Sequence, residues 1–211
     1  MKLIQALLLM LVVSPLAVNA APVAGQQFEV ITPEQPTVSG EKVEVTEFFS
    51  YACPHCHHFE APLQQWLKAN GGKAKFVQVP VIFRDEWRLF ARAFYTAEAL
   101  GVLDKTHATL FEAIHNLKRP FKTEADLAKF FAEQGVKQQD FNKAYASFAV
   151  DAKLRRSEEM TRRYSVNETP TLIVNGKYRV NGGLPAYRNL PAGEAFKAIF
   201  QTVDALLAKG G

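Results

Sequence analysis

Cysteine is scarce in this chain. Only two cysteines, Cys53 and Cys56, occur among its 211 residues. So small a number excludes a fold held together by several disulfides, and it leaves no second pair to complete a four-cysteine zinc site. A bond between these two would close a very short loop, which constrains the unfolded chain less than a long loop does. Chemistry therefore explains the pair better than stabilisation does.

An excess of charge of one sign is also lacking. The chain has 25 Lys and Arg residues against 21 Asp and Glu residues, a formal net charge of +4. Two basic pairs, Arg155-Arg156 and Arg162-Arg163, have Glu158 and Glu159 between them. This pattern is typical of an ion-paired helix face in solvent, and it argues against nucleic acid as a partner.

Long hydrophobic runs are absent except at the start of the chain. Residues 1–20 contain Lys2, an apolar stretch over 7–13 and small residues that end at Ala20. The whole apolar run is shorter than the ~20 residues that cross a bilayer, and Pro15 interrupts it. We therefore predict a secretory signal cleaved near Ala20, and an exported protein whose cysteines work in an oxidising compartment.

The pattern of apolar residues in the rest of the chain predicts both strands and helices. Strands are expected at 42–49 and 75–82, with a helix between them that starts at Cys53-Pro54 and ends near Asn70. A block of helices follows over 85–149, and a further helix over 151–164. The turn Asn175-Gly176 predicts a hairpin over 171–180, and a last helix is expected at 193–208.

Three kinds of chemistry fit the cysteine pair. The run Cys53-Pro54-His55-Cys56-His57 matches the C-x-x-C-H pattern of haem attachment, but Met160 is the only methionine outside the first 20 residues that could be a second axial ligand. Cys53, Cys56 and His57 would also share one helix face, as zinc ligands do, yet nothing completes the site. A redox-active dithiol at the junction of a strand and a helix is the third interpretation.

The dithiol interpretation agrees with the local physics. Cys53 lies at a helix N-terminus, where free N–H groups and the helix dipole favour a thiolate, and Pro54 fits the first helical position. His55, when protonated, adds a second favourable charge. Cys56 falls on the same helix face as Phe59, so we expect an exposed nucleophile at Cys53 and a shielded thiol at Cys56. An inert surface disulfide is the remaining alternative.

Two segments carry a resemblance to a known family. The chain is similar to the DsbA family of periplasmic thiol:disulfide oxidoreductases over nearly its whole length after residue 20. The Pro-His dipeptide between the cysteines is more specific than the C-x-x-C spacing alone. The matching segments are Glu47-Phe48-Phe49-Ser50-Tyr51-Ala52-Cys53-Pro54-His55-Cys56 and Thr169-Pro170-Thr171-Leu172-Ile173-Val174-Asn175-Gly176-Lys177-Tyr178.

The resemblance implies an α/β thioredoxin fold with an inserted helical domain. Residues 21–84 and 152–211 would form the thioredoxin fold, and residues 85–151 the insertion. Cys53 would be the attacked sulfur and Cys56 its partner. Pro170 would be cis against the cysteines, and the backbone of Thr169 would pair with an extended substrate. Glu47 would be a buried acid that exchanges protons with Cys56.

The function implied by the resemblance is oxidation of exported proteins. The Cys53–Cys56 disulfide, with no other cofactor and no metal, would pass to unfolded substrate proteins in the periplasm by thiol–disulfide exchange. A DsbB-type membrane oxidase would reoxidise a monomeric enzyme. A disulfide isomerase, a reductase, and a peptide-binding chaperone with an incidental disulfide are the alternatives.

The sequence departs from the family pattern at one position. Many thioredoxin-like proteins have a basic residue opposite the buried acid on the next strand, and here that position is occupied by Gln78. Without a cation, Glu47 should be harder to ionise when buried, so we predict a raised pKa. The alternative is that Glu47 faces outward from its strand and has no role.

Overall fold

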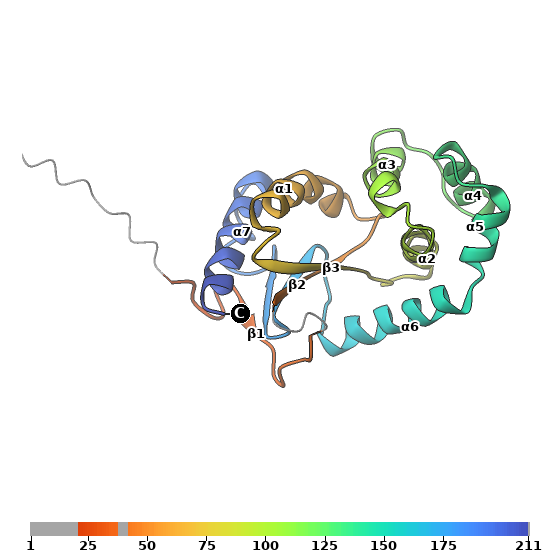
Figure 1. The fold of residues 1–211 in the computed structure, drawn as a ribbon. Helices are drawn as coiled ribbons and strands as arrows, with labels where there is room; N and C mark the ends of the chain where they lie inside the picture. The colour runs from red at the N-terminus through yellow and green to blue at the C-terminus, as the bar shows by residue number, and fades with distance from the viewer. Residues whose placement is uncertain (1–20, 38–41, 211) are drawn as a thin grey trace, which may run out of the picture.

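A five-stranded mixed sheet forms the centre of the protein in a computed structural model that describes residues 21–37 and 42–210. The strand order is β1-β5-β4-β2-β3, and only β2 and β3 are parallel (Figure 1). The expected signal sequence at 1–20 lies outside the described residues. The strands are β1 (Glu29–Val30), β2 (Val43–Phe49), β3 (Ala74–Pro80), β4 (Thr171–Val174) and β5 (Tyr178–Asn181).

In the described part of the chain, seven helices surround this sheet. Helices α1 and α7 lie together at one side of the molecule, α2 to α5 form a group at the other side, and α6 runs back from that group towards the sheet (Figure 1). Among the described residues, none of the helices has the length and apolar character needed to cross a membrane. The helices are α1 (Pro54–Asn70), α2 (Asp85–Ala99), α3 (Leu103–His115), α4 (Glu124–Glu133), α5 (Gln138–Tyr145), α6 (Phe148–Arg163) and α7 (Ala192–Ala208).

Local sequence signals explain most of these boundaries. Helix α1 starts with Pro54 directly after its N-cap Cys53, as predicted. The hairpin turn has φ of 52° at Asn175 and 67° at Gly176, which is the type I′ geometry that the dipeptide favours. A side chain at 176 would also collide with the carbonyl oxygen of Gln35. Strand β1 was not predicted, because a strand of two residues is too short to show an alternating pattern of apolar residues.

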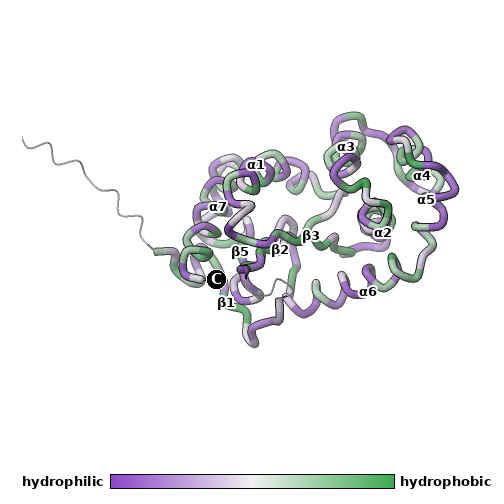
Figure 2. Tube along the Cα trace, viewed as in Figure 1, coloured by the Kyte–Doolittle hydropathy of each residue, from purple (hydrophilic) through white to green (hydrophobic). Residues whose placement is uncertain are grey.

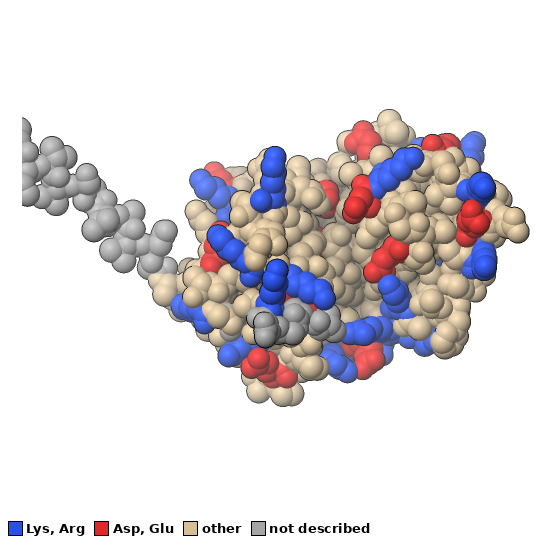
Figure 3. Space-filling view, viewed as in Figure 1, with Lys and Arg blue, Asp and Glu red and all other residues tan. Residues whose placement is uncertain are grey.

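The charge pattern predicted for the sixth helix is confirmed. Glu158 pairs with Arg88 of α2, and Glu159 pairs with Arg163 one turn along α6. On the face seen in Figure 3, basic and acidic side chains are interspersed rather than gathered in a patch of one sign. The helix begins at Phe148, three residues before the expected start, because Ser147 caps it by accepting the N–H of Val150.

The described residues form distinct hydrophobic cores on the two sides of the molecule. One core joins β2 and β4 to helices α1 and α7 through residues such as Val45, Phe59 and Phe200. Another lies within the helical group, where hydrophobic and hydrophilic residues alternate along the helices (Figure 2). This second core also contains Phe49 and Tyr51 from the end of β2 and its following turn, together with both cysteines.

The division of the chain at residues 85 and 151 stays a prediction. Helix α6 continues without a break from Phe148 to Arg163, across the expected boundary at 151. The end of β2 and the turn that follows it take part in the core of the helical group, so that group packs directly against the turn that carries the cysteines.

Candidate active site

The turn between β2 and α1 places the two cysteines. Strand β2 ends at Phe49, and the carbonyl of Ser50 then accepts the N–H of Cys53 at 3.0 Å, while the Ser50 hydroxyl accepts the N–H of Ala52 at 3.1 Å. Cys53 is the N-cap of α1 with extended backbone angles, and its carbonyl accepts the first helical hydrogen bond, from His57. Pro54 and His55 form the exposed first turn between the thiols.

Cys53 is surrounded by groups that favour its thiolate. Its pKa falls from 9.0 to about 5, chiefly because the Cys56 thiol donates a hydrogen bond to its sulfur. Burial opposes the shift, while Thr169 and the backbone N–H groups of Cys56 and His55 add to it. The N–H of Cys56 lies 3.4 Å from the sulfur. The contribution of His55 comes through its backbone, and a catalytic role for its imidazole stays a prediction.

Cys56 has the opposite character. Burial raises its pKa well above 9.0, and the neighbouring Cys53 sulfur and the charge of Glu47 act in the same direction. Cys56 is 1% exposed and lies beside Phe59 on the apolar face of α1, as predicted. Cys53 itself is only 6% exposed, so the prediction of a solvent-exposed nucleophile is corrected. The Thr169 segment covers it, with the carbonyl oxygen 3.4 Å from the Cys53 sulfur.

The Thr169-Pro170 peptide bond is cis, as the resemblance implied. Beside it lies a groove with a volume of about 310 Å³, lined by residues from the loops at 168–170 and 182–190 and from α7. His55 and Glu168 also line it, so the groove starts at the first turn of α1. Its apolar surface comes mainly from Pro170, Leu190, Phe196 and Ile199.

Glu47 is buried beneath the cysteines and faces Gln78, as the resemblance implied. The two residues are paired across parallel strands β2 and β3, and the Gln78 amide donates a hydrogen bond of 2.8 Å to the carboxylate. Glu47 is 2% exposed, which excludes the outward-facing alternative. Burial raises its pKa from 4.5 to about 8; the Gln78 hydrogen bond opposes this, and the negative charges of Glu60 and Cys53 add to it.

Three further residues join this site that the sequence did not identify. The Tyr51 hydroxyl lies 2.7 Å from Nδ1 of His107, and Nε2 of His107 lies 3.3 Å from Oε2 of Glu60 and 3.3 Å from Nε2 of Gln78. The available signal was a polar residue within an apolar helix face. His107 interrupts the stripe of α3, and Glu60 follows Cys56 by one helical turn.

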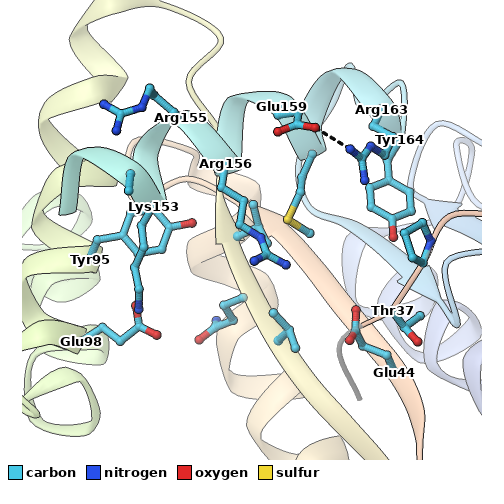
Figure 4. A pocket seen from close by; sticks show the side chains of 16 residues that line it. Thr37, Glu44, Tyr95, Glu98, Lys153, Arg155, Arg156, Glu159, Arg163 and Tyr164 are labelled. Carbon is cyan, nitrogen blue, oxygen red and sulfur yellow. Dashed lines mark hydrogen bonds and ion pairs between the residues drawn. The ribbon is translucent and has the colours of Figure 1, made fainter. Parts of the chain in front are cut away.

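A second, larger cavity has a different character. It has a volume of about 790 Å³ and lies between β3, α2 and α6 (Figure 4). Much of its charge is already paired, because Lys153 contacts Glu98 and Arg163 contacts Glu159. Gln78 also lines this cavity, so the residue that binds Glu47 borders an open space on its other side.

The structure gives no support to the zinc interpretation. In the part of the chain that the structure describes, no group of three or more His, Cys, Asp or Glu side chains is arranged to hold a metal ion. His57, the expected third ligand, stacks its ring on His115 of α3 with 4.8 Å between the centroids. Cys53 and Cys56 are free thiols that interact with each other.

Comparison with known proteins agrees with this geometry. Residues 44–187 match the family model of the DSBA-like thioredoxin domain. The thiol:disulfide interchange protein DsbA of Burkholderia cepacia is 40% identical over 177 residues, which cover 83% of this chain and 82% of that protein. The protein of the same name from Pseudomonas syringae is 38% identical over 76% of this chain and 75% of its own length.

Solved structures show the same likeness in three dimensions. The crystal structure of Pseudomonas aeruginosa DsbA superimposes with a TM-score of 0.81 at 30% identity, covering 90% of this chain and 94% of that one. The oxidoreductase DsbA from Xylella fastidiosa gives a TM-score of 0.80 at 31% identity over 90% and 97% of the two chains. The predicted thioredoxin fold is therefore confirmed. The chain belongs to the DSBA-like thioredoxin domain family, and it is a thiol:disulfide oxidoreductase.

Proposed function

We propose that the enzyme works as an oxidant that donates a Cys53–Cys56 disulfide to unfolded exported proteins. The observation that carries this proposal is the opposite displacement of the two thiol pKa values, to about 5 for Cys53 and well above 9.0 for Cys56. A thiolate with so low a pKa is a good leaving group, and its stability favours the reduced enzyme over the disulfide. Such a protein gives up its disulfide readily.

The reaction proceeds in two exchanges. A substrate thiolate attacks the Cys53 sulfur, the Cys53–Cys56 bond breaks, and Cys56 leaves and takes up one proton. A second substrate thiolate then attacks the substrate sulfur of the mixed disulfide and releases the Cys53 thiolate. The substrate is oxidised by two electrons and the enzyme is reduced by two. The disulfide is the only redox group that these steps require.

The groove beside Cys53 is the proposed substrate site. An extended substrate segment pairs with the backbone of Thr169, which brings its cysteine to the Cys53 sulfur. The apolar side chains of Pro170, Phe196 and Ile199 suit the hydrophobic residues that unfolded chains expose. Pro54 sets the start of α1 so that the first-turn N–H groups remain available to the thiolate.

The setting of the enzyme follows from the same proposal. Bacterial DsbA relatives act in the periplasm, and we assign this chain to that compartment after cleavage of the signal near Ala20. A DsbB-type membrane oxidase returns the reduced enzyme to its disulfide form. The enzyme acts as a monomer of one thioredoxin-fold unit, 21–84 with 152–211, and one helical insertion, 85–151.

Two assays and two matched variants test the proposal. The wild type should oxidise a dithiol peptide rapidly and reduce insulin slowly. With a substrate that contains a disulfide, the Cys53 thiolate of Cys56→Ser should attack that bond and accumulate as a mixed disulfide on non-reducing gels, because the internal resolving thiol is lost, whereas Cys53→Ser should form very few. Equal trapping by both variants contradicts the assigned roles. Full activity of Cys53→Ser would instead support a peptide-binding chaperone, because the apolar groove could bind peptides without the cysteines.

A further inference from the structure

Among the described residues of the sheet, none provides a positively charged partner for Glu47. Its carboxylate is buried, and the strand position opposite it holds Gln78, a neutral amide that donates one hydrogen bond of 2.8 Å. Taking up a proton from Cys56 requires Glu47 to be ionised first, and a buried carboxylate ionises readily only near a positive charge. The site therefore needs a cation that the sheet does not provide.

His107 reaches the same amide from the helical group. It lies on α3, it is 6% exposed, and its Nε2 is 3.3 Å from Nε2 of Gln78. The ring is held in place at Nδ1 by the Tyr51 hydroxyl at 2.7 Å. The rings of Phe49 and Phe111 each lie 5.3 Å from it, centroid to centroid. A ring fixed in this way presents one nitrogen to the Glu47 side of the site.

That nitrogen has two neighbours with opposite requirements. The Gln78 amide is a donor, so it is satisfied when Nε2 of His107 is unprotonated and accepts. Glu60 Oε2, also 3.3 Å from Nε2, is an acceptor, so it is satisfied when Nε2 carries a proton. Burial raises the pKa of Glu60, yet the pKa is lowered overall by the hydrogen bond and charge of His107, together with the hydrogen bond of Gln64 and the charge of His57. Glu60 thus offers an acceptor for a proton on Nε2 of His107.

We infer that His107 is a positioning residue that supplies, from the helical insertion, the switchable positive charge that Gln78 cannot supply from the sheet. The titratable groups that face it are Glu60 from α1, Glu47 from β2 behind the Gln78 amide, and the Tyr51 hydroxyl from the turn. From α2 it meets Phe94, which carries no charge. This inference deepens the proposed function and rests on it.

The charge acts on the return half of the reaction. When a mixed disulfide at Cys53 closes, the Cys56 thiol gives its proton to the Glu47 carboxylate, and the Cys56 thiolate attacks the Cys53 sulfur. The Cys53–Cys56 bond forms, the bond from Cys53 to the outer sulfur breaks, and that sulfur leaves as a thiolate. Protonated His107 neutralises Glu60 and favours the ionised form of Glu47, so it speeds this proton transfer. The Cys53 thiolate is stabilised by the start of α1 and is little affected.

The test compares two histidines of one helix. His107→Gln removes the charge at the site, and His115→Gln is the matched control, because His115 is also on α3 and contacts the turn through the carbonyl of Tyr51. Each protein is loaded as a mixed disulfide of Cys53 with glutathione, and closure by Cys56 is followed by rapid mixing from pH 5 to 10. The ultraviolet absorbance of the thiolate gives the Cys53 titration separately.

We expect His107→Gln to raise the pH midpoint of closure by about one unit and to slow closure at pH 7 about tenfold. The Cys53 titration should move by less than about 0.3 unit, and His115→Gln should keep the wild-type midpoint. Equal shifts in the two variants, or an equal shift of the Cys53 titration, would overturn the inference. Failure of the wild type to close the mixed disulfide at all would instead refute the proposed function.

A positive charge introduced at position 78 provides a second test of the inference. Gln78 borders the large cavity, which leaves room for a longer side chain. Gln78→Lys should restore most of the closure rate to His107→Gln, and its effect should be much smaller in the native background, where a cation is already present. Additive effects of the two substitutions contradict the inference. A decrease of one full unit in the pH midpoint of closure, caused by Gln78→Lys alone, also contradicts the inference. This test stands even if His107→Gln fails to fold.

Discussion

The two cysteines differ far more in their electrostatic surroundings than in their exposure. Cys53 is 6% exposed and Cys56 is 1% exposed, yet the pKa of the first falls to about 5 while that of the second rises well above 9.0. Cys53 accepts a hydrogen bond from the Cys56 thiol and faces amide N–H groups at the start of a helix, whereas Cys56 is buried among apolar side chains near the carboxyl of Glu47. Three positions along one helix therefore separate a stable thiolate from a stable thiol.

The largest expected effect concerns the rates at which the two thiols react. At pH 7 a thiol with a pKa of about 5 is almost wholly ionised, whereas one with a pKa above 9.0 is ionised to less than about 1%. Brief alkylation of the reduced protein should label Cys53 at least ~100-fold faster than Cys56, as measured by peptide mass mapping. Labelling of Cys53 should slow as the pH falls through 5. Comparable rates would remove the electrostatic distinction.

The carboxyl beneath Cys56 should make stability depend on pH. The pKa of Glu47 rises from 4.5 to about 8 on folding, so between these values the unfolded chain gives up a proton that the folded protein keeps. The free energy of unfolding therefore falls by about 1.4 kcal/mol for each unit that the pH rises in this window, and Glu47→Gln removes this dependence. The variant should be about 3 kcal/mol more stable than wild type at pH 7 and nearly equal at pH 4, by urea unfolding.

Glu112→Gln provides the control for that measurement. Glu112 is an exposed carboxylate on α3, so its substitution should leave the shape of the stability curve unchanged. If Glu47→Gln and Glu112→Gln gave parallel curves, Glu47 would not be the buried acid that distinguishes the two cysteines.

The thiolate should make the reduced enzyme the more stable form at pH 8. A pKa depressed to about 5 contributes stability that is complete above the unfolded value and disappears as the pH falls through 5. At pH 8 this amounts to about 4 kcal/mol, against ~2 kcal/mol for closing a loop this short. The reduced form should melt roughly 4–8 °C higher at pH 8. At pH 5 the order should reverse, and a higher melting oxidised form at both pH values would contradict the assignment.

The smallest expected effect belongs to His55. Its side chain is exposed, so solvent screens any charge it carries, whereas its backbone N–H already acts on the thiolate. His55→Gln should therefore raise the Cys53 titration midpoint by less than about 0.5 unit, measured by thiolate absorbance. His58→Gln, another exposed histidine of α1, is the control. A shift of more than one unit would show that the imidazole, and not the backbone, sets the character of Cys53.

The sequence was sufficient for those parts of the site that local rules determine. A proline after Cys53 indicated the helix start, and Asn175-Gly176 indicated the turn. These features depend on neighbours a few residues apart. Each of them is confirmed by the structure.

The rest of the site depends on contacts that no local pattern encodes. His107 reaches Gln78 across 29 positions of sequence and Tyr51 across 56, and in the sequence it looks like an ordinary member of a helix stripe. The cover over Cys53 comes from Thr169, 116 positions away, which is why its exposure was overestimated. Tertiary packing determines both the contacts of His107 and the exposure of Cys53.

The shared core of the turn and the helical group has a consequence for newly made chains. Phe49, Tyr51 and both cysteines pack with side chains as far along the chain as Leu154. At a synthesis rate of roughly 5–20 residues per second, these partners emerge about 5–20 seconds after the cysteines do. Until Thr169 also follows, Cys53 lacks the segment that covers it in the finished fold, and its turn lacks the packed core of the helical group. The nascent chain therefore passes through a stage in which its cysteines are themselves open to oxidation, and the oxidising power belongs only to the finished fold.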